Sequence, residues 1–185
     1  MRSNGTNIMS CVVVGNSPSV SCDSDVIDSH NYVIRNKIPY GDHNVGERID
    51  MLVSRTRKVN LILNDPTLKE FRYKQIYMDP DDEPHPGELL IYHNNLLKLD
   101  LETMKTEIGL KHNEKPTIGI VAVFIGLQLF GSVSMTGIEH EFDSDYINTG
   151  HYDDLDYNRV NDHHNLYKEM MYLKKHIRSE HVAVL

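Results

Sequence analysis

Residues 151–164 concentrate side chains that can exchange a proton near neutral pH. This segment begins with His151-Tyr152 and ends with His163-His164, in a chain with 11 histidines. An imidazole has a reference pKa near 6.5, so a positioned histidine can accept a proton from a hydroxyl group at neutral pH. A histidine that precedes an amphipathic helix is more commonly a surface or capping residue. These residues are therefore candidates for acid–base chemistry, and the pattern alone leaves both interpretations open.

The same segment has the composition of a metal site. Four aspartates lie between the histidines: Asp153, Asp154, Asp156 and Asp162. Imidazole and carboxylate groups are common metal ligands, and a metal-dependent transferase or hydrolase is one alternative. Neither a His-Glu-x-x-His sequence nor a pair of closely spaced cysteines is present, and acidic runs are commonly solvated loops. We expect no metal and no cofactor.

The stretch SCVVVGNSPSV, residues 10–20, predicts a buried strand that ends in a turn of small polar residues. Such a turn can present N–H groups to a phosphate, and Gly15 permits a close approach of backbones. The Asn16 amide can both donate and accept, whereas Ser17 and Ser19 carry hydroxyl donors. The alternative to ligand binding is a turn that only reverses the chain, in which Asn16 adopts a positive φ.

A second candidate binding element is the start of the apolar helix predicted at 119–130. Pro116 suits a first helical turn, and Thr117 is a good N-cap residue. Gly119 follows within the first turn, where unpaired N–H groups and a partial positive charge favour an anion. Thr117 and Gly119 are thus candidate ligand contacts, and a cap without a ligand is the alternative for Thr117.

The elements that must position these residues alternate between strand and helix. Apolar runs predict strands at 11–15, 31–35, 49–53, 59–63, 132–137 and 181–185. Helical spacing of apolar residues predicts helices at 95–108, 119–130 and 163–177, the last with Leu166, Met170, Leu173 and Ile177 on one face. Continuous apolar runs are typical of strands covered on both faces, so we predict one α/β domain with a mostly parallel sheet. Ligands bind such sheets at the carboxyl ends of the strands.

Bulk properties restrict the possible functions. The 185 residues suit one domain, and a net charge of −8 argues against binding to a nucleic-acid backbone. We find no apolar run long enough for a membrane span and no signal peptide. With only two cysteines, Cys11 and Cys22, the sequence predicts a reduced cytoplasmic protein. We predict one compact domain over 1–185 with a flexible 1–9, and a mobile Pro-rich acidic loop at 79–87.

Four motifs in order resemble those of the sialyltransferases. Residues 10–55 are similar to the long sialylmotif of the animal enzymes, through Cys11, Gly15-Asn16-Ser17, Asp28-Ser29-His30, Asn36-Lys37-Ile38-Pro39 and Asn44-Val45-Gly46-Glu47-Arg48. Residues 115–137 look like the short sialylmotif. Gly150-His151-Tyr152-Asp153 is similar to the His-Tyr motif, and His164 followed by Glu169 fits the very short motif, His-x4-Glu. The turn at 15–19 also resembles that of the bacterial sialyltransferases.

The chain departs from the family pattern at several positions. No cysteine lies in 115–137 to pair with Cys11, so we expect a free buried thiol. Ile118 stands where the family has Ser or Thr before the short-motif glycine, and the usual Arg-x-Asn is compressed to Arg35-Asn36. Residues 55–114 match no family motif.

The resemblance implies a variant GT-A-type sialyltransferase fold, Rossmann-like, and transfer of sialic acid from a CMP-sugar to a hydroxyl of a glycan acceptor. It implies inversion without a metal, with His164 as general base and with His151 and Tyr152 at the leaving phosphate. Gly15, Asn16, Ser17, Ser19, Asn36, Thr117 and Gly119 would bind the donor. Glu169 would brace a loop by accepting backbone N–H groups. A nucleotide-binding module without catalysis, and a CMP-sugar other than CMP-sialic acid, are alternatives.

Overall fold

A computed structural model describes residues 10–16, 23–36, 46, 48–54, 75–78, 101–111, 114–138 and 165–185. Its centre is a six-stranded sheet in the order β4-β3-β2-β1-β5-β6, in which every neighbouring pair is parallel. The strands are β1 (Cys11–Val14), β2 (Tyr32–Arg35), β3 (Met51–Ser54), β4 (Gln75–Met78), β5 (Val133–Thr136) and β6 (Val182–Val184). The predicted α/β class and parallel sheet are confirmed.

The strand order reverses beside β1. After β1 the chain builds outward through β2, β3 and β4, and then returns to place β5 on the other side of β1. Val13 accordingly pairs with Ile34 of β2 and with Met135 of β5. In open parallel sheets, ligands bind outside the carboxyl ends of the strands at such a reversal.

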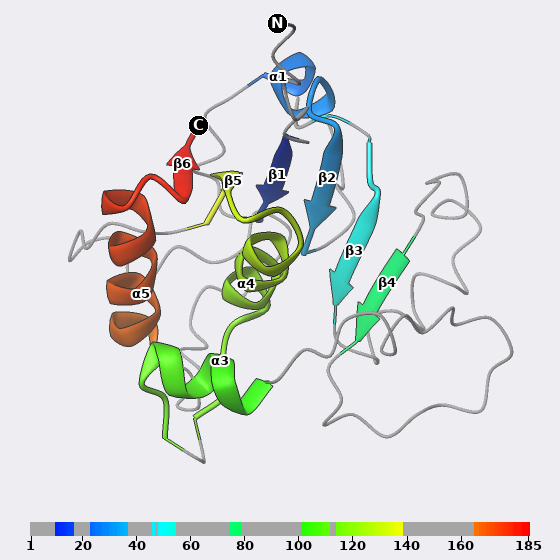
Figure 1. Ribbon diagram of the computed structural model, residues 1–185. Coiled ribbons are helices and arrows are strands. Elements are labelled where there is room, and N and C mark those ends of the chain that lie inside the picture. The colour runs from blue at the N-terminus through cyan, green and yellow to red at the C-terminus, as the bar shows by residue number, and fades with distance from the viewer. Residues whose placement is uncertain are drawn as a thin grey trace, which may run out of the picture.

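Helices cover both faces of this sheet, which accounts for the continuous apolar strands. On one face lie α3 (Leu101–Ile108), α4 (Ile118–Phe130) and α5 (Leu166–Arg178), with α4 in front of the central strands (Figure 1). The short α1 (Ser24–Asp28) covers the other face, where Ile27 packs against Val12, Val14 and Val33. The larger core lies under α4, whose residues 120–126 are all buried, as its apolar composition predicts.

Some predicted elements differ from the structure. Strand β4 and helix α1 are not predicted from the sequence. On α5, Met170 and Leu173 are buried as predicted, but Leu166 is 42% exposed and Tyr172 takes part in the core instead. Leu166 lies in the first turn, whereas Tyr172 lies further along α5 and packs into the core cluster. The predicted strand at 59–63, the loop at 79–87 and the N-terminal 1–9 lie outside the described residues.

No helix in the described part of the chain is long and apolar enough to cross a membrane.

Candidate functional site

The carboxyl ends of β1 and β5 meet very closely at the strand reversal. The N–H of Gly15 donates to the carbonyl of Thr136 at 2.8 Å. A Cβ atom on Gly15 would lie 1.9 Å from the carbonyl oxygen of Gly137 and 2.6 Å from Cγ1 of Ile138. The close approach that Gly15 permits is therefore to the backbone of β5. Glycine is required here by packing, whatever the site binds.

Asn16 follows at this edge as a buried polar side chain, only 3% exposed. Among the described residues the one non-glycine with a positive φ is Glu180. The alternative in which Asn16 serves to adopt a left-handed turn is therefore wrong. A buried amide at the end of a strand can donate to and accept from a bound group, as predicted for Asn16.

Asn36 occupies the equivalent place at the end of β2. Its N–H donates to the carbonyl of Val14 at 3.3 Å, and the residue is 9% exposed. Within the described part of the chain, the buried Oδ1 of Asn36 accepts no hydrogen bond. A buried polar atom without a partner is costly, typically by about 1–3 kcal/mol. A ligand at this edge would supply the missing donor.

The N-terminus of α4 faces the same amide. A Cβ on Gly119 would lie 3.7 Å from Nδ2 of Asn36 and 3.7 Å from Cγ1 of Ile138. In the described residues, the N–H of Ile120 is bound by the Thr117 side chain, whereas no hydrogen bond takes the N–H groups of Ile118 and Gly119. Free N–H groups at a helix N-terminus favour an anion. The predicted residues Gly15, Asn36 and Gly119 therefore come together.

Thr117 acts as the N-cap of α4 and binds α5. Its Oγ1 accepts from the N–H of Ile120 at 3.4 Å, and its own N–H and hydroxyl donate to Glu169 at 2.8 and 2.6 Å. Both Thr117 donors are thus used inside the protein, and a nucleotide contact from Thr117 stays a prediction. The expectation that Glu169 accepts a backbone N–H is confirmed.

Glu169 is a buried carboxyl group, 4% exposed. Burial raises the pKa of Glu169 to about 7, against the opposing effect of the two hydrogen bonds from Thr117. The carboxyl group therefore titrates near neutral pH at the N-terminus of α4. This property follows from the contact of the first turn of α5 with the N-cap of α4, which the spacing of the motif does not predict.

Comparison with solved structures identifies this architecture. A mammalian sialyltransferase superposes with a TM-score of 0.58 and 18% identity, over 96% of this chain and 68% of that one. An alpha-2,3-sialyltransferase from Campylobacter jejuni gives 0.58 and 16%, over 97% and 76%. The sialyltransferase CstII from Campylobacter jejuni, in complex with the substrate analogue CMP-3FNeuAc, gives 0.57 and 14%, over 95% and 79%. The chain has the sialyltransferase fold. No family model and no curated protein sequence matches it.

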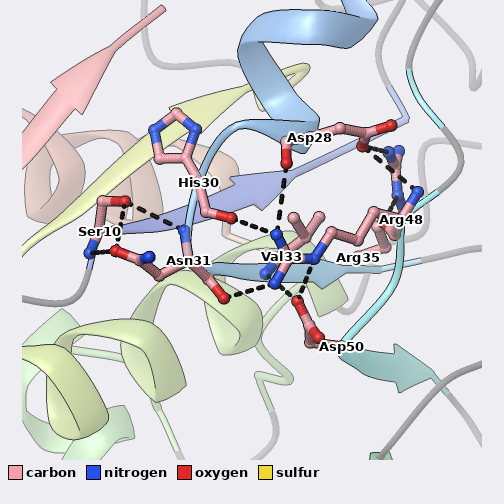
Figure 2. Close-up of polar contacts among 8 residues, drawn as sticks. All are labelled: Ser10, Asp28, His30, Asn31, Val33, Arg35, Arg48 and Asp50. Carbon is pink, nitrogen blue, oxygen red and sulfur yellow. Dashed lines mark hydrogen bonds and ion pairs between the residues drawn. The ribbon is translucent and has the colours of Figure 1, made fainter.

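Several residues that carry the motif resemblance stabilise the sialyltransferase fold. Arg48 donates to the carbonyls of Asp28, His30 and Asn31, where α1 leads into β2, and pairs with Asp50 at 2.9 Å (Figure 2). The Asp50 carboxylate also accepts the N–H of Val33 at 3.0 Å. Arg48 thereby joins the α1–β2 connection to the start of β3.

Gly46 and Asp28 belong to the same cluster. Gly46 has a φ of +73°, and a Cβ there would lie 2.5 Å from Oδ1 of Asp28. This oxygen accepts the N–H of Arg48 at 3.3 Å. The buried Arg35 donates from Nε to the Arg48 carbonyl at 2.9 Å. The matched residues Asp28, Gly46 and Arg48 thus have an architectural role where α1 leads into the amino end of β2 and where β3 begins.

Cys11 is a free buried thiol, as expected. Burial, with a smaller effect of Asp50, raises the pKa of Cys11 to about 12, so this thiol is unreactive at neutral pH.

The remaining predicted site residues lie outside the described part of the chain: Ser17, Ser19, His151, Tyr152 and His164. Their roles stay predictions, as does the alternative metal site at 151–164. Two further residues are not indicated by the sequence pattern: Glu114, which contacts the N-terminus of α5, and Asp50, a charged residue immediately before an apolar strand.

Proposed function

We propose that the protein transfers sialic acid from CMP-sialic acid to a hydroxyl group of a glycan acceptor, with inversion and without a metal. The observation that carries this proposal is the meeting of Asn36 with the α4 N-terminus. Within the described residues, a buried carbonyl oxygen that has no donor and two N–H groups that have no acceptor lie at the strand reversal of a sialyltransferase fold. CstII, which has this fold, was solved with CMP-3FNeuAc.

The two kinds of group suit different parts of a nucleotide. The N–H groups of Ile118 and Gly119 would donate to the phosphate, because the helix N-terminus favours negative charge. Oδ1 of Asn36 would accept from a ribose hydroxyl, and the buried amide of Asn16 would contribute beside it. Hydrogen bonds to a charged acceptor are about twice as strong as neutral ones. This arrangement favours a nucleoside monophosphate as leaving group.

The transfer is a single displacement in this proposal. The acceptor oxygen attacks the anomeric carbon of sialic acid, and the bond from that carbon to the phosphate oxygen breaks. CMP leaves with the electron pair, and the hydroxyl proton passes to His164. His151 and Tyr152 would donate to the departing phosphate, where stabilising developing charge is typically worth about 3–4 kcal/mol.

A transfer assay with matched histidine variants tests the proposal. Purified protein with CMP-sialic acid and a galactoside acceptor, in buffer with EDTA, should form the sialylated product. His164→Ala should lower kcat by about 10²–10⁴-fold, the range typical of a general base, with little change in CMP affinity. His163→Ala is the matched control and should retain activity.

The controls separate the parts of the proposal. Loss of transfer in the His163 variant alone would reassign the base to the neighbouring histidine. Activity that disappears with EDTA and returns with manganese would favour the metal site instead. A wild-type protein that transfers nothing to a range of acceptors would contradict the proposed activity.

A further inference from the structure

The N-terminus of α5 is anchored by a carboxylate from another part of the chain. Asn165 caps the helix, with its Oδ1 accepting the N–H of Lys168 at 3.2 Å. The Nδ2 of the same Asn165 donates to Oε1 of Glu114 at 2.9 Å. The other carboxylate oxygen, Oε2, lies 2.9 Å from Nζ of Lys168 and accepts the N–H of Lys111 at 2.8 Å. Glu114 therefore binds both the cap and the first turn of α5.

Glu114 lies just before α4, in the segment that also contains Thr117. Thr117 in turn donates twice to Glu169, which is in the first turn of α5. The segment 114–117 thus contacts the start of α5 at two separate points. One contact is made by Glu114 with Asn165 and Lys168, and the other by Thr117 with Glu169. Together they fix the start of α5 relative to the N-terminus of α4.

The Glu114 contact is ionic and geometrically defined. The side chains of Glu114 and Lys168 are only 17% and 28% exposed. The hydrogen bond from Asn165, with those from Lys111 and Lys168, lowers the pKa of Glu114 to about 2, so the group is anionic at neutral pH. A single exposed ion pair contributes little, but here one carboxylate accepts from three donors on two segments.

Asn165, which Glu114 holds, is next in the sequence to the proposed general base. His164 immediately precedes Asn165, and consecutive Cα atoms across a trans peptide are about 3.8 Å apart. The residue that Glu114 holds is thus one peptide bond away in the sequence from the proposed general base. We propose that Glu114 is a positioning residue, which holds the start of α5 so that His164 meets the acceptor hydroxyl at the donor-binding edge. This inference rests on the proposed function.

Variants of Glu114 test the inference through two readouts. A misplacement of about 1 Å can lower a rate by about 10²-fold. We expect Glu114→Ala to lower kcat by about 10- to 100-fold, and Glu114→Gln, which keeps one acceptor oxygen, to lower it less. The Kd for CMP should stay within about twofold of wild type, because Asn36 and Gly119 do not contact Glu114. Hydrogen exchange at the amides of Lys168 and Glu169 should accelerate by about 10-fold in Glu114→Ala.

Glu180→Gln is the matched control, since it makes the same change of charge at an exposed residue after α5. It should leave kcat and exchange within twofold of wild type. A Glu114→Ala variant with wild-type kcat, or one whose Kd for CMP rises as much as kcat falls, would overturn the inference. So would unchanged exchange at Lys168 and Glu169. A wild type that transfers nothing, combined with faster exchange in Glu114→Ala, would instead contradict the proposed function and support the anchoring.

Discussion

The buried carboxyl group of Glu169 accepts both the N–H and the hydroxyl of Thr117, at 2.8 and 2.6 Å. This contact links the very short motif to the short motif, which are 52 residues apart at these positions. It places the first turn of α5 against the N-cap of α4, beside the edge proposed to bind the donor. The contact therefore couples the helix that follows His164 to the helix that would meet the phosphate.

Glu169 should make stability depend on pH between about 4.5 and 7. Because burial raises the pKa of Glu169 to about 7, the folded protein binds more protons than the unfolded chain in this range. The contribution is fully present below the unfolded pKa and is lost as pH rises through the folded pKa. The free energy of unfolding of Glu169→Gln should increase relative to wild type by up to about 3 kcal/mol between pH 4.5 and 8, at about 1.4 kcal/mol for each pKa unit.

Urea denaturation at several pH values measures this difference, with Glu180→Gln as the matched control. A difference between Glu169→Gln and wild type that is constant across the range would contradict a buried carboxyl group titrating near neutrality.

Two glycines at the candidate site should respond in opposite ways to alanine. Gly15→Ala places a Cβ against the Gly137 carbonyl, a backbone atom that cannot move aside, and should destabilise the fold by more than about 3 kcal/mol.

Gly119→Ala meets only ordinary contacts, and alanine favours a helix. That variant should fold normally and bind CMP about 10-fold more weakly, because its methyl group would stand between Asn36 and the phosphate. Thermal unfolding and calorimetry measure the two effects, and a stable Gly15→Ala protein would show that the strand ends are further apart.

Arg48→Met should destabilise the protein by about 2–3 kcal/mol, because it removes the cation paired with the buried Asp50 and the hydrogen bonds of a guanidinium that is itself 35% exposed. Asp50 is 2% exposed and would lose its cation, while three carbonyls of the α1–β2 connection would lose their donor. Arg48→Lys should lose less, since one ammonium keeps the charge but cannot reach all the acceptors. Denaturant unfolding checks both values; equal stability of Arg48→Met and wild type would exclude the architectural role.

Asn36→Ala should bind CMP about 10- to 100-fold more weakly while its thermal stability stays close to wild type. Its Oδ1 accepts no hydrogen bond within the described residues, so the substitution removes a ligand contact and little else. Asn31→Ala is the control at the opposite end of β2, where the exposed side chain contacts Ser10. Equal CMP affinity in the Asn31 and Asn36 variants would place the nucleotide elsewhere.

The sequence predicts most of the sheet because its central strands are short continuous apolar runs. Strand β4, Gln-Ile-Tyr-Met, lies at the edge of the sheet and mixes polar and apolar residues. It is therefore not predicted from apolar runs. Asn36 and Gly119 can be identified from the sequence as candidate ligand contacts, because Asn36 belongs to a stretch that resembles the long sialylmotif and Gly119 lies at the start of an apolar helix. The contacts of Glu114 with the start of α5 cannot be predicted, because Asn165 and Lys168 lie 51 and 54 residues away in the sequence and reach Glu114 only in the folded chain.

Calorimetric titration of the wild-type protein with CMP, UMP and AMP, in buffer containing EDTA, tests the central claim most directly. We predict that CMP binds with a 1:1 stoichiometry, and that UMP and AMP bind at least 10-fold more weakly. Failure of all three nucleotides to bind, in protein whose unfolding is cooperative, would contradict the claim that the carboxyl edge around Asn36 and Gly119 is a CMP-sugar site.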